Sequence, residues 1–234
     1  MRLAHYEPLS LGDFPGRLAT SVFTVGCNFA CPYCHNPELV SAPEGTPRLT
    51  EEAFFVFLER RRGKLDGVCI TGGEPTLHAD LAEFVERIRS LGYAVKLDTN
   101  GSNPEMLAHL METRSLDYVA MDVKAPPSRY AEVTGNSHAL ALAENSIRLL
   151  AECDIVHEYR TTVLPLLFSE ADIDAVASML PAGSTYVIQN FALTKTLDPG
   201  FMSARGFEPW DLETIAERTR LHYPSLHIST RGGI

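Results

Sequence analysis

Residues 67–75 read Gly-Val-Cys-Ile-Thr-Gly-Gly-Glu-Pro, an apolar and β-branched run that ends at two glycines and a proline. Such a run is typical of a buried strand, and the glycines and proline indicate a tight turn after it. A helical pattern over residues 79–90 follows and stops at Gly92. The stretch therefore predicts one strand–loop–helix unit.

The same alternation continues along the chain in both directions. Strand patterns cover residues 18–25, 67–71, 94–98, 118–122, 156–163, 185–189 and 226–230. Helical patterns cover residues 50–62, 79–90, a segment from 104 onward, 137–151, 170–179 and 211–222, with Thr50 as the expected N-cap of the first. Residues 198–208 show neither pattern and are expected to form a surface loop.

Repeated strand–helix units predict right-handed crossovers and a mainly parallel sheet with helices outside it. Six units and a trailing strand are fewer than the eight of a closed (β/α)8 barrel. The sequence therefore predicts an α/β fold in which residues 1–234 form a single domain, a partial and open (β/α)6 barrel.

Composition narrows the class of protein. The net charge of −10 disfavours a nucleic-acid surface, which needs clustered Lys and Arg. No stretch approaches the ~20 apolar residues of a membrane span, and the first residues lack the apolar core of a secretory signal. The five cysteines, three of them within eight residues, favour a thiolate metal site over a disulfide framework. We therefore expect a cytoplasmic protein without nucleic-acid or membrane partners.

Cys27, Cys31 and Cys34 have the spacing C-x3-C-x2-C. Thiolates are soft ligands for iron–sulfur clusters or zinc. Three ligands on a cube of four irons leave one iron open to an external ligand. The alternative is a structural zinc site completed by His35, Cys69 or Cys153, although structural zinc usually has paired C-x2-C units.

Polar motifs follow the predicted strands at their C-terminal ends, where parallel α/β folds bind ligands. They are Gly72-Gly73-Glu74-Pro75, Asp98-Thr99-Asn100-Gly101 and Asp122-Val123-Lys124. Each has an ordinary alternative, namely a strand-to-helix turn for the first and a pairing of Lys124 with an aspartate for the others. Arg160 lies within a strand and could point into the barrel, where it would need an anionic partner.

Taken together, these motifs resemble the radical S-adenosylmethionine (SAM) superfamily, whose signature is C-x3-C-x-aromatic-C, with Tyr33 as the aromatic residue. The sequence is more similar still to activating enzymes of glycyl-radical proteins, specifically those of anaerobic ribonucleoside-triphosphate reductase. The stretches that carry the resemblance are residues 13–16, 26–37, 71–76, 97–104, 120–126 and 158–163.

The resemblance implies a [4Fe-4S] cluster on Cys27, Cys31 and Cys34, with SAM on the open iron. The residues expected beside SAM are Tyr33, His35 through its backbone, Gly72, Gly73, Glu74 as an acceptor for the ammonium group, Lys124, and Arg160, which would meet either the SAM carboxylate or Glu158. In the related activating enzymes a monovalent cation lies beside the SAM carboxylate, and the resemblance assigns it here to Asp98, Thr99 and Asp122.

The implied reaction is reductive cleavage of SAM to a 5′-deoxyadenosyl radical, which generates a glycyl radical on the anaerobic reductase; flavodoxin would be a suitable electron donor. Two alternatives stay within the superfamily: an activating enzyme of another glycyl-radical enzyme, of the pyruvate formate-lyase type, and a radical SAM enzyme that acts on a small molecule. A third is a non-enzymatic metal-binding protein.

Overall fold

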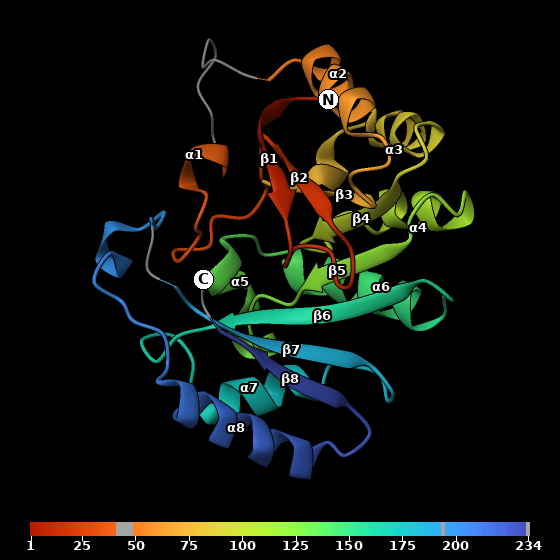
Figure 1. The fold of residues 1–234 in the computed structure, drawn as a ribbon. Helices are drawn as coiled ribbons and strands as arrows, with labels where there is room; N and C mark the ends of the chain where they lie inside the picture. Colours follow the sequence, from red (N-terminus) through yellow and green to blue (C-terminus); the bar gives the residue numbers. More distant parts are fainter. Residues whose placement is uncertain (41–48, 193–194, 233–234) are drawn as a thin grey trace.

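One sheet of eight strands organises the protein, and the computed structural model describes residues 1–40, 49–192 and 195–232 around it (Figure 1). The strands are β1 (Leu3–Ser10), β2 (Ala19–Thr24), β3 (Gly67–Gly72), β4 (Ala94–Thr99), β5 (Tyr118–Asp122), β6 (Val156–Val163), β7 (Thr185–Asn190) and β8 (His227–Arg231). They pair in sequence order, β1 antiparallel to β2 and every later pair parallel. Within the described ranges no pairing joins β8 to β1, so the barrel is open.

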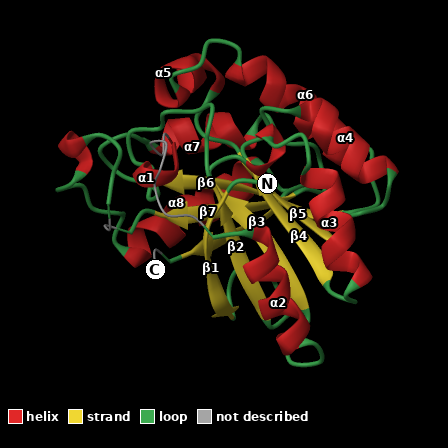
Figure 2. Ribbon diagram, turned by 90° about the horizontal axis from the view of Figure 1, so that it is seen from above, coloured by secondary structure: helices red, strands yellow, loops and turns green. Residues whose placement is uncertain are grey.

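Helices surround the strands, which gather in the middle of the molecule when it is seen from above (Figure 2). They are α1 (Pro37–Val40), α2 (Glu51–Arg61), α3 (Leu81–Ser90), α4 (Pro104–Glu112), α5 (Tyr130–Thr134), α6 (Ala139–Ala151), α7 (Glu170–Ala177) and α8 (Pro209–His222), with short 3₁₀ turns at Pro75–Leu77, Pro127–Arg129 and Pro199–Phe201. Thr50 caps α2 as predicted, because its hydroxyl accepts from the backbone N–H of Ala53 at 3.2 Å. No helix of the described part is long and apolar enough to cross a membrane.

The inner face of the sheet is polar near the site. In β4, the buried Val95 and Leu97 belong to the hydrophobic core, whereas Lys96 and Asp98 point the other way. Asp98 reaches Arg160 of β6 across the barrel, so the alternation of β4 places both polar residues on the inside. The lumen therefore holds charged side chains on the face of the sheet opposite the hydrophobic core.

The structure confirms the open α/β barrel with six parallel strand–helix units and a trailing strand. The short helices α1 and α5, the 3₁₀ turns and the strand β1 were not predicted. β1 carries Pro8 and alternates poorly, which a strand tolerates at the edge of a sheet. In addition, α3 starts at Leu81 instead of residue 79, because the 3₁₀ turn at Pro75–Leu77 precedes it.

Candidate functional site

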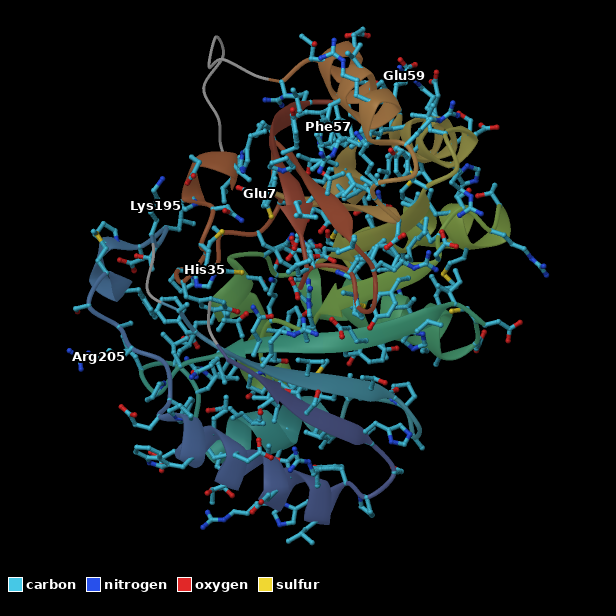
Figure 3. The ribbon with its side chains drawn as sticks, viewed as in Figure 1. Glu7, His35, Phe57, Glu59, Lys195 and Arg205 are labelled. Atoms are coloured by element: carbon cyan, nitrogen blue, oxygen red, sulfur yellow. The ribbon has the colours of Figure 1, made fainter. Side chains whose placement is uncertain are left out.

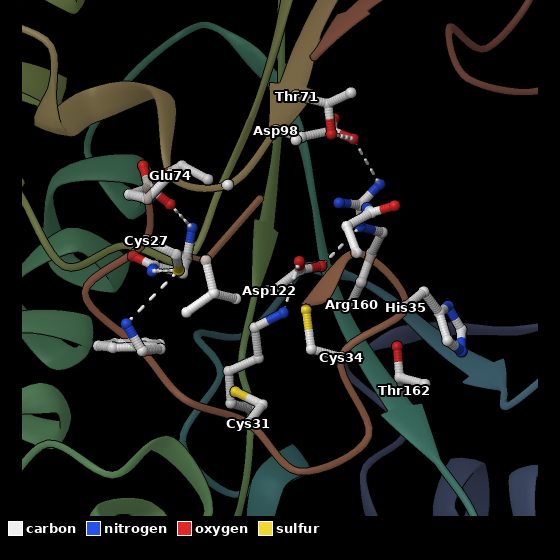
Figure 4. Close-up of a pocket in the computed structure, with 18 of the residues that line it drawn as sticks. Cys27, Cys31, Cys34, His35, Thr71, Glu74, Asp98, Asp122, Arg160 and Thr162 are labelled. Carbon is white, nitrogen blue, oxygen red and sulfur yellow. Dashed lines mark hydrogen bonds and ion pairs between the residues drawn. The ribbon is translucent and has the colours of Figure 1, made fainter. Parts of the chain in front are cut away.

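A cavity of about 250 Å³ lies at the C-terminal ends of the parallel strands (Figure 4). It brings together every residue that the sequence predicted for the site: Cys27, Cys31, Tyr33, Cys34, His35, Gly72, Gly73, Glu74, Asp98, Thr99, Asp122, Lys124 and Arg160. Its wall comes from the loop of residues 26–36, called the cysteine loop below, and from β3 to β7. The structure thus places these residues around one cavity, and the role of each residue in binding a ligand stays a prediction.

The cysteine loop is fastened to distant parts of the barrel. The backbone N–H of Glu74 donates to the carbonyl of Gly26 at 2.7 Å, and that of Ala30 donates to Thr134 at 2.8 Å. The hydroxyl of buried Tyr33 donates to the carbonyl of Lys124 at 3.1 Å. The loop is thereby held by residues after β3 and β5 and at the end of α5.

The two glycines after β3 permit this close packing. Gly72 has a φ of 111°, in the region that favours glycine. A β-carbon on Gly73 would lie 2.2 Å from the carbonyl oxygen of Gly26. The turn is therefore built for direct backbone contact with the cysteine loop.

The thiols of the cysteine loop lie in partly water-excluded surroundings. Burial raises the pKa of Cys27, and raises the pKa of Cys31 to about 12 even though Lys124 opposes the shift. The Sγ atom of Cys27 also accepts from the N–H of Phe29 at 3.4 Å and from Asn100 at 3.8 Å. Such thiols ionise readily only when a metal centre replaces the missing water.

These thiols fit an iron–sulfur cluster better than a single ion. All three line one cavity, yet in the described part of the chain no three His, Cys, Asp or Glu side chains are placed to hold one metal ion. Zinc needs its ligands at about 2.0–2.3 Å around one point, whereas a cluster spreads its thiolates over several irons. The donor set therefore fits the predicted cluster.

Glu74 lies under the cavity and is fully buried. Its carboxylate accepts from the N–H of Asn100 at 2.6 Å and from the hydroxyl of Thr99 at 2.7 Å. It also accepts from the N–H and hydroxyl of Thr76. The carboxylate thereby joins the turn after β3 to the end of β4, while Glu74 also lines the cavity, so its role as an acceptor for a ligand ammonium group stays a prediction. The Thr99 hydroxyl is engaged in the same contact.

His35 lies on the same side of the view in Figure 3 as Lys195 and Arg205, which belong to the segment after β7. Asp198 of that segment donates its N–H to the carbonyl of Pro32 at 3.0 Å, so the segment packs against the cysteine loop. Burial and the charge of Lys124 lower the pKa of His35, which favours its neutral form. Its Nε2 atom is buried without a hydrogen-bond partner among the described residues.

Five side chains of alternating positive and negative charge form a row of ion pairs across the lumen. In order they are Lys96, Asp98, Arg160, Asp122 and Lys124, and we call this row the ionic chain. Arg160 lies 3.3 Å from Asp98 through Nη1 and donates from Nε to Asp122 at 2.9 Å. Lys124 pairs with the other oxygen of Asp122 at 2.9 Å, the ordinary pairing that the sequence left open beside a ligand role for Lys124.

Burial opposes ionisation of both aspartates, but the neighbouring cations outweigh it and lower the pKa of Asp98 and of Asp122. Glu158 is not the partner of Arg160, contrary to one of the two expectations, because Arg231 and Tyr118 bind it instead. Both carboxylates of the ionic chain are therefore ionised and bound by cations of the protein.

Two charged residues of the site region, Lys96 and Asp13, were not assigned to the site from the sequence. The strand pattern of residues 94–98 gives Lys96 no role in the site, although the period-2 alternation of residues 94–99 places it on the same face as Asp98. Asp13 lines the cavity from the β1–β2 connection and accepts from the hydroxyl of Ser21. Residues 13–16 were named only as a stretch that carries the resemblance, and Asp13 was given no place in the site because β1 itself was not predicted.

Comparisons with known proteins agree with this site. The family model of the radical SAM superfamily matches residues 21–180. A protein of Methanocaldococcus jannaschii, provisionally named a glycyl-radical enzyme activating enzyme, is 32% identical over 230 residues, which cover 96% of this chain and 94% of that protein. The pyruvate formate-lyase-activating enzyme of Listeria monocytogenes is 30% identical over 59% of each chain. The 7-carboxy-7-deazaguanine synthase of Thermococcus kodakarensis is 28% identical over 76% of each chain.

Solved structures share the fold. QueE from Escherichia coli matches with a TM-score of 0.57 and 17% identity, over 98% of this chain and 93% of that chain. SuiB from Streptococcus suis, solved bound to SAM, matches with a TM-score of 0.64 and 14% identity, over 89% of this chain and 48% of that chain. At these identities the likeness concerns the fold alone.

Proposed function

Because this chain belongs to the radical SAM superfamily, we propose that it is an activating enzyme that generates a glycyl radical on anaerobic ribonucleoside-triphosphate reductase. The observation that carries the proposal is the cavity itself, where three cysteine thiols face the ionic chain at the C-terminal ends of the strands. The near full-length similarity to the M. jannaschii protein supports activation of a glycyl-radical protein, and the motif resemblance supports the reductase as that protein.

Cys27, Cys31 and Cys34 would hold the [4Fe-4S] cluster. When bound, the cluster would supply one electron to the sulfonium of SAM, which then yields methionine and a 5′-deoxyadenosyl radical able to remove a hydrogen atom from a glycine Cα. The reductant would come from outside the chain, and we propose a flavodoxin for it.

The residues of the chain bind and orient in this scheme. Arg160 and Lys124 present positive charge to the cavity and suit the carboxylate of an amino acid. Glu74 keeps the glycine turn against the cysteine loop, so that backbone groups of Gly72 and Gly73 stay beside the cavity. Buried Tyr33 and half-buried His35 add surface that limits access of water.

The open side of the barrel supports a macromolecular substrate. β1 and β8 are the two ends of the sheet, and no pairing between them closes it in the described residues. A polypeptide loop could enter from that side to bring a glycine to the cavity.

The test is anaerobic incubation of the cluster-loaded protein with SAM, a reductant and the candidate reductase, followed by electron paramagnetic resonance. We expect a glycine-centred radical on the reductase and none when its radical-bearing glycine is replaced by alanine. C153A is a suitable control variant, because Cys153 lies outside the cavity, and it should remain active. Formation of 5′-deoxyadenosine without a radical on the reductase would refute the partner.

Two relatives define the competing functions for the same experiment. If this chain activates pyruvate formate-lyase, as its similarity to the activating enzyme of that protein suggests, the glycine-centred radical should form on pyruvate formate-lyase and not on the reductase. A small-molecule substrate is the other possibility, since 7-carboxy-7-deazaguanine synthase matches three quarters of the chain. SAM cleavage that increases with a small molecule, and with neither protein, would favour that function.

A further inference from the structure

Lys96 is a buried lysine for which the proposed function has no use. Its side chain is 1% exposed, inside the barrel on β4. The Nζ atom pairs with Asp98, lies 3.7 Å from the Sγ atom of Cys69 and faces the ring of Tyr118 with 5.8 Å to its centroid. Burial of an ammonium group is unfavourable unless a counter-charge compensates it, so such a residue calls for a reason.

The ionic chain leaves both of its carboxylates fully bound by cations. One oxygen of Asp98 faces Lys96 and the other faces Arg160 at 3.3 Å. The oxygens of Asp122 face Arg160 and Lys124 at 2.9 Å each. The ionic chain contains three cationic side chains and two carboxylates, so these five residues together carry a net charge of +1.

The expected alkali-metal ion does not fit this arrangement. Such an ion needs several oxygen ligands at once. Each carboxylate oxygen of Asp98 and Asp122 already faces a protein cation, and the hydroxyl of Thr99 donates to Glu74. An added cation would also approach three positive side chains.

We propose that Lys96 is a built-in cation of the site, which holds Asp98 against Arg160 and so orients Arg160 toward the bound ligand without an alkali-metal ion. The identity of that ligand, SAM, rests on the proposed function. Lys96 does not line the cavity, and it acts through Asp98 as a positioning residue. Among the described residues, Nη2 of Arg160 makes no hydrogen bond, which leaves it available to an anionic group in the cavity.

A tethered ammonium group differs from a bound metal ion in one measurable way: it cannot dissociate. Ligand binding by the wild-type protein should therefore be the same in potassium chloride, sodium chloride and choline chloride at equal ionic strength. Removal of the Lys96 side chain should create the need for a cation, because Asp98 then lacks one partner and a space is left beside it.

The experiment compares the wild type, K96A, K96R and the double variant K96A/D98N, with K64A as the control, since Lys64 is exposed. SAM dissociation constants are measured anaerobically by equilibrium dialysis on cluster-loaded protein, and unfolding midpoints are measured on the same variants in each salt. We expect K96A to bind SAM about tenfold more weakly in choline chloride and to recover in potassium or ammonium chloride. K96R and K64A should behave like the wild type in every salt.

The outcomes separate the two proposals. Wild-type SAM binding that requires potassium or sodium, or a K96A variant that binds SAM normally in choline chloride, would overturn the role of Lys96. If K96A does not fold, the wild type and K96R decide the question by their salt dependence. A wild type that binds SAM in no salt would refute the proposed function instead. In that case a higher unfolding midpoint for K96A/D98N than for K96A would still support the Lys96–Asp98 pair.

Discussion

Gly73 lies so close to Gly26 that the turn after β3 and the cysteine loop share one backbone contact: a β-carbon on Gly73 would be 2.2 Å from the carbonyl oxygen of Gly26. The obstacle is backbone, which cannot move aside as a flexible side chain can. The position of Cys27, the first cysteine of the loop, therefore depends on a residue nearly fifty positions away in the sequence.

This contact makes Gly73→Ala informative. We expect G73A to displace the cysteine loop, lower the free energy of unfolding by about 1–3 kcal/mol and reduce the iron bound per chain. The matched control is G12A, because a β-carbon on Gly12 would meet nothing within 4 Å. Thermal unfolding and iron analysis after anaerobic reconstitution give the comparison, and equal iron content in the two variants would contradict it.

Arg160 bridges two strands through its planar guanidinium, which a lysine cannot imitate. We expect R160K to keep the charge but lose one of the two contacts, and to weaken SAM binding by about tenfold. Equilibrium dialysis measures the change. R205K serves as the control because Arg205 is exposed, and equal affinities in R160K and R205K would count against a positioning role for the bridge.

Tyr33 ties the cysteine loop to the residue after the end of β5 by a single hydrogen bond. Y33F should therefore leave the carbonyl of Lys124 without this donor and destabilise the protein by about 1 kcal/mol. Y6F makes the same chemical change at a hydroxyl without a hydrogen-bond partner among the described residues, and it should unfold like the wild type. Chemical denaturation measures both, and similar losses would show that the hydrogen bond is unimportant.

Asp122 gives the site a predictable response to acid. Burial opposes its ionisation, but Arg160 and Lys124 lower the pKa of Asp122 below its unfolded-state value. The ionised carboxylate therefore stabilises the fold above about pH 4, and this contribution is lost as the pH falls toward the folded-state pKa.

The test compares D122N with the cluster-free wild type, so that loss of a cluster in acid plays no part. We expect D122N to be less stable by about 2 kcal/mol between pH 7 and pH 5, with a difference that shrinks below about pH 4. Unfolding by denaturant at each pH measures it. A difference that stays constant down to pH 3, or disappears by pH 6, would mean that another group controls the effect.

The fold followed from the sequence because strand and helix periodicities alternate cleanly from β2 to β8. The strand β1 was not predicted, because edge strands tolerate proline and need no regular alternation of apolar and polar residues. The position of Asp13 at the cavity was not predicted for the same reason, since its contact with Ser21 depends on the hairpin that β1 makes with β2.

The positions around the cavity were predictable because ligand-binding groups follow the strands at one end of a parallel sheet. Their partners were not. The alternation of β4 places Lys96 inside the barrel. Lysine side chains are rarely buried, however, so the residue type favoured an exposed position. The motif around Glu74 also could not show that Asn100, Thr99 and Thr76 donate hydrogen bonds to its carboxylate.

The anchors of the cysteine loop also bear on the order of assembly. Its hydrogen-bond partners come from Glu74, Lys124 and Thr134, so the three thiols reach their positions only after the chain has folded past α5. A short zinc finger, by contrast, folds around its metal. We expect this protein to mature in two stages, in which an apoprotein with its barrel already formed later receives iron and sulfide, so that chelators should remove the metal without unfolding the chain.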